Sequence, residues 1–376
     1  MIPVRILHVV TSMDAGGIET MLMNIFRNID REKVVFDFAV HRETDGHYDE
    51  EIHSLGGKVH VFPRLKPHKT ISYIKLFHEF LDKNPQYTIV HSHINQYSFL
   101  PLLAASRKLG IFKVAHGHQC HEGWSSMRKH RLPFILLCKA GINKVTDARF
   151  ACSRDAGAWL FGKDKDFHVL SNAIDASRYS FRGKPDDNVK AKLGLDEKFV
   201  IGHIGNFSKA KNYPFILEVF SRLLEKKPDS MLVLVGKNGS NPWVEERIKE
   251  LGIQESVVLT GVRSDIPDLL KAMDAFLFPS LHEGLPVTLV EAQASGIKCL
   301  VSDAVTEEVK ITDNLEFMSL EKPAEAWAEK LLEYAAGYDR QDTYQQIVDA
   351  GYDIQSNVRW LENFYLEAAQ RAKQSA

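Results

Sequence analysis

The chain has little cysteine and almost no net charge. Its 376 residues include four scattered cysteines, at positions 120, 138, 152 and 299, with no C-x-x-C pair. This pattern argues against a disulfide framework or a cysteine zinc site and favours free thiols in a reducing cytoplasm. A formal net charge of −2 argues against a nucleic-acid partner bound through overall basicity.

Long apolar runs and several familiar phosphate motifs are also missing. No window approaches 18 uninterrupted apolar residues, so no membrane-spanning helix is expected. No secretory leader is expected either, because residues 2–10 lack a basic leader followed by a long apolar core. There is no Walker P-loop, and neither half carries the G-x-G-x-x-G turn of a dehydrogenase. No D-x-D pair stands where it could hold Mg²⁺, because Asp164-Lys-Asp166 falls in a surface turn. These absences argue against a membrane-spanning protein and a plain dehydrogenase, and they leave no sequence motif for Mg²⁺.

What the chain does contain is a repeated alternation of buried strands and amphipathic helices. This alternation predicts an α/β fold with two parallel, helix-covered sheets, and the length suits two domains. We predict a first domain over 1–178, a second over 179–352, and a C-terminal helix over 353–376. The predicted strands are 4–10, 36–41, 58–62, 88–91, 112–115, 150–153 and 167–170, then 199–204, 231–235, 257–259, 275–278, 298–302 and 316–320.

The stretch FPSLHEGLPVTLVE, from Phe278 to Glu291, joins a buried strand to a helix. Glu283 follows the strand and Glu291 lies about two turns into the helix. Ligands of open α/β sheets bind beyond the carboxyl ends of the strands, and a helix N-terminus favours phosphate. The alternative to a binding role is structural. In that case Glu283 caps the helix and Glu291 is a solvated side chain on it.

Three further loops of the second half are predicted to converge on the same edge of its sheet. They bring cations and bare glycine backbone, which together suit a diphosphate. Glu291 could then contact the ribose of a nucleotide, and Glu283 could contact the group attached beyond the diphosphate. The candidate residues in these loops are Gly205, Asn206, Lys209, Lys211, Gly236 and Arg263, and those beside Glu283 are Gly284, Leu285 and Pro286.

The first half offers a glycine turn and a set of histidines after its strands. Gly16 and Gly17 separate the first strand from a helix, which permits close approach of a ligand, although a plain tight turn is equally compatible. Histidines follow the fourth and fifth predicted strands, at His91, His93, His116 and His118. A zinc site is one interpretation. Since no acid or cysteine has suitable spacing, contact with a phosphate or a sugar hydroxyl is favoured.

A basic segment lies between the two sets of candidates. Residues 127–144 contain five lysines or arginines, no acid and an apolar centre. One interpretation is a half-buried helix with a solvated basic face. The other is peripheral contact with an anionic membrane surface.

Taken in this order, the motifs resemble those of glycosyltransferase family 4, with GT-B architecture, over nearly the whole chain. The strand–GGIE–helix opening resembles the family's first loop, and Ser171-Asn172-Ala-Ile-Asp175 resembles its N-G-I-D turn. The span from Glu283 to Glu291 is similar to its E-x7-E motif. The stretches SMDAGGIET, GVRSDIPDLL and FPSLHEGLP look closest to an exopolysaccharide-type subgroup.

The resemblance implies two Rossmann-like domains facing a crevice and a metal-independent, retaining transfer from a nucleotide-sugar. It implies that Lys211 and Arg263 contact the diphosphate, that Glu283 lies near the donor sugar, and that Glu291 contacts the ribose. It places His118, or next His116, near the reacting centre. The acceptor it implies is a glycan, and the basic segment suggests a lipid-linked one at the inner face of the plasma membrane.

One position departs from the family pattern. Asn206 stands where the family usually has arginine, and asparagine brings no charge to a phosphate. Either Lys209 or Lys211 supplies the charge, or activity is reduced. This departure prompts one alternative, a catalytically weak nucleotide-sugar-binding protein. The other alternative is a nucleotide-sugar epimerase of the same two-domain architecture.

Overall fold

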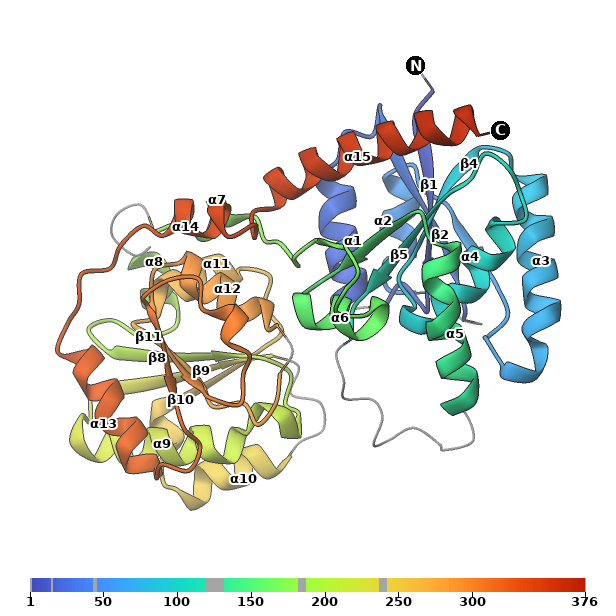
Figure 1. Cartoon of the computed structure of the whole chain (residues 1–376). Helices are drawn as coiled ribbons and strands as arrows, with labels where there is room; N and C mark the ends of the chain where they lie inside the picture. Colours follow the sequence, from blue (N-terminus) through green and yellow to red (C-terminus); the bar gives the residue numbers. More distant parts are fainter. Residues whose placement is uncertain are drawn as a thin grey trace. The chain divides into compact units, whose positions relative to one another are not determined.

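The computed structural model divides the chain into two compact units (Figure 1). It describes residues 2–14, 16–42, 46–119, 132–181, 187–236, 242–283 and 285–375. Unit 1 comprises residues 1–173 together with 354–376, and unit 2 comprises residues 174–353. Each unit is an α/β domain, in agreement with the predicted fold class.

The described residues of unit 1 form a seven-stranded sheet in the order β3-β2-β1-β4-β5-β6-β7, with neighbouring strands parallel. Its strands are β1 (Val4–Val10), β2 (Val34–Val40), β3 (Val59–Val61), β4 (Tyr87–Ser92), β5 (Phe112–Gly117), β6 (Ala148–Ala151) and β7 (His168–Val169). Its α-helices are α1 (Gly17–Asn28), α2 (Asp49–Ser54), α3 (Thr70–Lys83), α4 (Phe99–Ala105), α5 (Leu132–Val145), α6 (Arg154–Phe161) and α15 (Ile354–Gln374).

Helices cover both faces of this sheet, which explains the continuous apolar strands of the sequence. Successive side chains of a strand point to opposite faces. In β1, Ile6 packs into the cluster built with α1 and α15, whereas Leu7 packs into the cluster built with α3, α4 and α5. All seven residues of β2 are buried. The sheet is therefore the centre of a three-layer unit.

The described part of unit 2 repeats the plan with a six-stranded sheet in the order β10-β9-β8-β11-β12-β13, also with neighbouring strands parallel. Its strands are β8 (Phe199–Ile204), β9 (Ser230–Val235), β10 (Val257–Gly261), β11 (Ala275–Phe278), β12 (Lys298–Ser302) and β13 (Leu315–Met318). Its α-helices are α7 (Ala176–Tyr179), α8 (Asp187–Lys192), α9 (Tyr213–Lys226), α10 (Pro242–Glu250), α11 (Ile266–Ala272), α12 (Val287–Ala294), α13 (Ala324–Ala335) and α14 (Tyr344–Asp349).

The boundary between the units lies at 173/174, whereas the sequence places it after residue 178. Ile174 forms a parallel bridge with Asp353, so the two crossings between the units lie side by side. Ala176 and Tyr179 are buried in the core of unit 2. The short helix α7 thus belongs to unit 2, because its apolar side chains pack there.

The C-terminal helix α15 packs on the sheet of unit 1 (Figure 1). Val358, Leu361, Tyr365 and Ala368 recur every three or four residues and are all buried in the unit 1 core. This spacing puts them on one helix face, so the helix is held by apolar burial. Tyr365 also bonds a histidine of β4, as described below.

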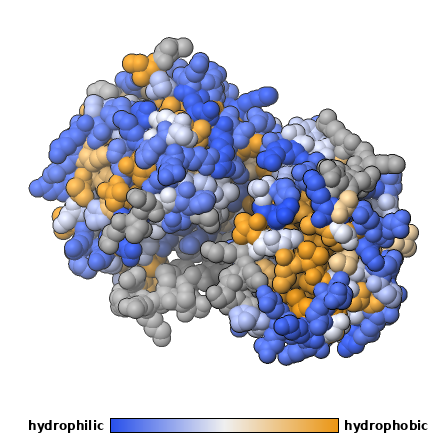
Figure 2. All heavy atoms as spheres, turned by 180° about the vertical axis from the view of Figure 1, so that it is seen from behind, coloured by the Kyte–Doolittle hydropathy of each residue, from blue (hydrophilic) through white to orange (hydrophobic). Residues whose placement is uncertain are grey.

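Figure 2 shows one side of the molecule as mostly hydrophilic, with apolar patches between the charged side chains. Apolar atoms contribute to the surface of any folded protein, so scattered patches have no special meaning. Among the helices that the structure describes, none has the length and apolar character needed to cross a bilayer.

Candidate active site

Unit 2 contains a pocket of about 360 Å³ at the carboxyl ends of β8, β9 and β10. Five of the candidate residues from the sequence line it: Gly205, Asn206, Lys211, Gly236 and Arg263. Strand order also reverses beside it, since β9 and β10 extend the sheet on one side of β8, and β11 on the other. Such a switch point is where open α/β sheets bind ligands.

Two glycines allow the strand-end loops to approach each other. A Cβ on Gly236 would lie 2.0 Å from the carbonyl oxygen of Gly205, and the φ of Gly236 is +155°. A Cβ on Gly205 would lie 3.0 Å from Cε of Lys211. The pocket wall at these two positions is therefore bare backbone, as a diphosphate site requires.

Lys211 brings a positive charge to the pocket from a short 3₁₀ helix, Lys209–Lys211. Its Nζ lies 2.7 Å from a carboxylate oxygen of Glu283 and 4.4 Å from the centre of the Phe278 ring. The backbone N–H of Leu281 donates to the carbonyl of Ala210, at 2.7 Å, which ties this turn to the strand-end loop of β11. Lys211 and Glu283 are thus brought together as an ion pair.

Lys209 lies on the same 3₁₀ helix but is exposed. Asn206 is exposed as well and lines the pocket without charge. Of the two lysines that the sequence offers as substitutes for the family's arginine, Lys211 is the one that lines the pocket.

Arg263 is held in place by Asp265, two residues further along the chain. Its Nε and Nη2 donate to the two carboxylate oxygens at 2.8 and 2.6 Å. This bidentate pair raises the pKa of Arg263 and lowers the pKa of Asp265. A guanidinium carries five N–H donors, so donors remain for an anion after Asp265 has taken two.

Thr288, which the sequence reasoning missed, also lines the pocket from the first turn of α12. Its Oγ1 is buried and has no hydrogen-bond partner among the described residues. A buried hydroxyl without a partner is unfavourable by about 1–3 kcal/mol. Its position in the first turn, where backbone N–H groups are also free, is the signal that could have found it.

Glu291 lies three residues after Thr288 on α12, and accepts a hydrogen bond from the hydroxyl of Tyr179 at 2.7 Å. Desolvation raises the pKa of Glu291 to about 7, and the bond from Tyr179 opposes this only in part. The helix thus places a partly buried carboxylate, poised to ionise near neutral pH, one turn from the pocket-lining threonine.

This raised pKa predicts the pH dependence of stability. The folded chain holds the Glu291 proton up to about pH 7, and the unfolded chain only up to about 4.5. The contribution of this group to stability is therefore full at low pH and falls as pH rises through that window. We expect Glu291→Gln, which still accepts from Tyr179, to melt a few degrees above the wild type at pH 8.

The measurement is the melting temperature of both proteins between pH 4 and pH 8. The gap between them should close at the acidic end, where wild-type Glu291 is protonated. A gap that stays constant over this range would show that the carboxylate does not titrate as its surroundings indicate.

Two of the candidates beside Glu283 contribute to packing and to the start of a helix. Leu285 packs against the core of unit 2, and Pro286 is the N-cap residue of α12. Gly284 lies outside the described residues. The contribution of Leu285 and Pro286 in this structure is to fix where α12 begins.

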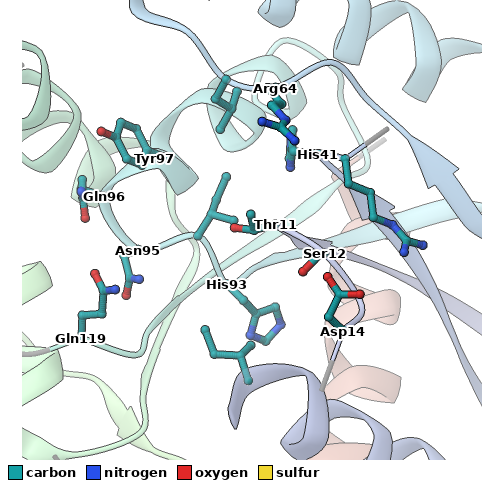
Figure 3. Close-up of a pocket in the computed structure, with 14 residues that line it drawn as sticks. Thr11, Ser12, Asp14, His41, Arg64, His93, Asn95, Gln96, Tyr97 and Gln119 are labelled. Carbon is teal, nitrogen blue, oxygen red and sulfur yellow. The ribbon is translucent and has the colours of Figure 1, made fainter. Parts of the chain in front are cut away.

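Unit 1 has its own pocket, of about 610 Å³, at the carboxyl ends of its strands (Figure 3). Most of the residues that line it are polar. Figure 3 shows His93 between Asn95 and Gln119 on one side and Ser12 and Asp14 on the other. The remaining lining residues are Thr11, Ile18, His41, Arg42, Arg64, Leu65, Ile94, Gln96 and Tyr97.

The glycine turn predicted from the sequence lies at the start of α1, after this pocket's first loop. Gly16 is the N-cap residue of α1 and Gly17 its first residue. A Cβ on Gly16 would lie 2.3 Å from Oε2 of Glu19, whereas Gly17 has open space around it. The Glu19 side chain is flexible and could turn away, so neither glycine is required by a close approach of backbone.

One group of histidines comes from three strands: His8 lies within β1, His91 within β4 and His116 within β5, while His93 and His118 follow β4 and β5. All of them except the partly exposed His118 are buried. His8 Nδ1 lies 3.0 Å from His93 Nε2, and His93 Nδ1 lies 3.0 Å from His118 Nε2. The rings of His116 and His118 are stacked with centres 4.0 Å apart. His8 was missed by the sequence reasoning, although a histidine inside an apolar strand is itself a signal.

Two contacts hold this group in place. The hydroxyl of Tyr365 on α15 lies 2.7 Å from Nδ1 of His91. The backbone N–H of His118 donates to the side-chain oxygen of Asn95, at 2.8 Å. Desolvation lowers the pKa of His8 and of His118 to about 3, and holds the pKa of the other three well below its usual range. The five imidazoles are therefore neutral at neutral pH.

Models of two protein families match the chain. Residues 185–353 match the family described as glycosyl transferases group 1, and residues 15–178 match glycosyltransferase family 4. The two matches fall one after the other along the chain, much as the two sheets do.

Several curated proteins are similar over long stretches. The putative glycosyltransferase EpsF of Bacillus subtilis (strain 168) is 35% identical over 371 residues, covering 96% of both chains. An Escherichia coli enzyme named UDP-Gal:alpha-D-GlcNAc-diphosphoundecaprenol alpha-1,3-galactosyltransferase is 29% identical over 230 residues, covering 59% of both chains.

Solved structures of low sequence identity share the fold. A glycosyltransferase from Rickettsia africae superposes with a TM-score of 0.77 at 16% identity, covering 97% of this chain and 98% of the other. Alr3699/HepE from Anabaena, solved in complex with UDP, gives 0.70 at 18% identity, covering 98% of both chains. The architecture is GT-B, as the sequence motifs predict.

Proposed function

The chain belongs to the group 1 (family 4) glycosyltransferases, and from that premise we propose that it moves a sugar from a UDP-sugar to a growing polysaccharide. The observation that carries the donor half of this proposal is the unit 2 pocket, where Lys211 and Arg263 meet bare glycine backbone and the first turn of α12. Alr3699/HepE, which shares the fold, was solved with UDP.

In this proposal the diphosphate occupies the unit 2 pocket. Lys211 and Arg263 neutralise its charge. The hydroxyl of Thr288 donates a hydrogen bond to a phosphate oxygen, and the absence of side chains at Gly205 and Gly236 leaves space for the phosphates. Asn206 contributes a neutral donor, and Lys211 supplies the charge that its side chain lacks. Glu291 contacts the ribose, and Glu283, held beside Lys211, faces the donor sugar.

The chemical step follows from where charge develops. As the bond to the sugar breaks, the sugar gains positive character and the leaving diphosphate gains negative charge. Fixed cations stabilise that negative charge more in the transition state than in the bound donor, which is what accelerates the reaction. We propose retention of configuration, with the leaving phosphate taking the proton of the acceptor hydroxyl.

His118, with His116 beside it, is assigned to the neighbourhood of the reacting centre. The diphosphate itself is assigned to protein cations and not to a metal ion, since Lys211 and Arg263 supply positive charge at the pocket.

For the acceptor we propose a lipid-linked glycan at the cytoplasmic face of the plasma membrane. The Escherichia coli relative is named for a diphosphoundecaprenol-linked acceptor. In this chain, α5 exposes Leu136 and Leu137, with 47% and 63% of each residue accessible, next to Lys139. Exposed leucines beside lysine suit a shallow contact with an anionic bilayer. Residues 127–131 of the basic segment lie outside the described residues.

We expect the protein to bind vesicles that contain anionic lipid at low salt and to leave them as salt rises. The double variant Leu136→Gln/Leu137→Gln should bind several-fold more weakly in a co-sedimentation assay. Leu109→Gln is the matched control, because Leu109 is 76% exposed on another part of unit 1. A protein that stays off anionic vesicles at low salt would remove the membrane part of the proposal.

The reaction is tested by two assays in sequence. In a thermal-shift screen of nucleotide-sugars, the true donor should stabilise the chain by about 2.7 kcal/mol at a hundred times its dissociation constant. That donor is then incubated with and without a lipid-linked acceptor, and UDP release is measured. Release that depends on acceptor supports transfer, whereas conversion of donor without acceptor would identify an epimerase instead.

A further inference from the structure

The histidines of unit 1 form a group with metal-ligand geometry, separate from the diphosphate pocket of unit 2. We propose that His93, His116 and His118 bind a divalent transition-metal ion, with zinc as the ion that fits best. One ring nitrogen from each of the three lies within 4.8 Å of the others. Zinc bonds imidazole nitrogen at about 2.0–2.1 Å, so tetrahedral ligands stand about 3.4 Å apart. The rings of His116 and His118 are stacked with centres 4.0 Å apart, so these rings must turn before their lone pairs meet at one ion.

His116 supplies independent support. Its side chain is fully buried, and neither ring nitrogen has a hydrogen-bond partner within the part of the chain that the structure describes. A buried polar group without a partner is unfavourable by about 1–3 kcal/mol. A metal ion would use the lone pair of one nitrogen, and the neutral ring that burial favours is the form that ligates.

His8 provides the outer contact that metal-binding histidines generally have. With Nδ1 of His93 on the metal, its Nε2–H can donate to Nδ1 of His8, 3.0 Å away. That bond fixes the tautomer and orientation of the ligand ring. A second trio, of His8, His91 and His93, has similar spacing but is fully buried and shares His93. We therefore assign the ion to the trio with access to the surface.

Access comes through the unit 1 pocket. His93 lines that pocket (Figure 3). His118 is partly exposed. Three imidazoles leave one position of a tetrahedral ion open, for water or for an oxygen atom of a molecule in the pocket. Asp14 lines the same pocket and brings an acidic side chain to it.

The sequence favours hydrogen bonding over metal binding here, because no acid or cysteine is suitably spaced. The structure removes that objection, since three histidines alone complete a ligand set of a known kind. The site concerns unit 1 only. Binding of UDP in unit 2 is therefore expected to be unchanged by a chelator.

The test titrates the full chain, freed of metal by chelator and without an affinity tag, with Zn²⁺ in a calorimeter and with Co²⁺ by visible absorption. We expect one ion per chain and the absorption of tetrahedral cobalt. His118→Gln should lower affinity at least about tenfold. His118 is partly exposed, so this variant should fold even if changes at buried His116 do not.

His60→Gln is the matched control, because His60 is also partly exposed in unit 1 but bonds Tyr87 outside the group. Circular dichroism and melting curves confirm that each variant is folded. The proposal is overturned if the wild-type chain takes up neither ion in stoichiometric amount. It is equally overturned if folded His118→Gln binds as tightly as His60→Gln.

Discussion

Replacing Lys211 by alanine is expected to lower the kcat of sugar transfer by about 10²–10³-fold, the usual loss for one group that stabilises developing charge. Its ammonium lines the unit 2 pocket and is held by Glu283 at 2.7 Å and by the Phe278 ring. The loss should fall on kcat more than on KM, because the leaving diphosphate is most negative in the transition state. Acceptor-dependent UDP release at saturating donor measures it.

Lys209→Ala is the matched control for this variant. Lys209 lies on the same 3₁₀ helix, carries the same charge and is exposed. It should keep most of the activity. The Lys211–Glu283 pair is partly exposed, so its loss should change stability by about 1 kcal/mol or less. Near-normal turnover by Lys211→Ala would refute its assigned role.

The second large effect is expected from Gly236→Ala. The new Cβ would stand 2.0 Å from the carbonyl oxygen of Gly205, a backbone atom that cannot move aside alone. The strand-end loops of β8 and β9 would have to separate, and the pocket wall would move with them. We expect UDP affinity, measured by calorimetry, to fall at least about tenfold, in line with a binding loss of more than 1.4 kcal/mol.

Gly252→Ala separates this steric effect from the general penalty of a positive φ. Gly252 has a φ of +67° and open space where a Cβ would point. That variant should lose about 1 kcal/mol of stability and bind UDP normally. Equal UDP affinity for the two variants would show that the close approach at Gly236 does not shape the site.

Much of this fold can be predicted from the sequence, because its parallel strands are buried on both faces. Continuous apolar runs therefore marked strands such as β1 and β11 at their observed bounds. The helix α12, which follows the central stretch, also begins and ends where its pattern predicts. The position of the boundary between the units, at 173/174, was harder to predict, since it depends on the packing of α7 into unit 2.

The candidate site could be predicted only in part, because several of its residues are brought together by three-dimensional packing. Sequence could not choose between Lys209 and Lys211, because the direction of each side chain depends on the turn that ends in left-handed Asn212. Thr288 stands in the first turn of a helix, but that position marks a site only when a pocket lies beside it. His8 stands out within an apolar strand, but its partner His93 becomes known only when the sheet brings the two together.

The central claim is that unit 2 binds the donor diphosphate through Lys211 and Arg263. A crystal structure of the chain with UDP tests it most directly. We predict diphosphate oxygens within hydrogen-bond distance of Nζ of Lys211 and of the guanidinium of Arg263, beside the backbone of Gly205 and Gly236. A diphosphate found away from this pocket, for example among the histidines of unit 1, would contradict the account.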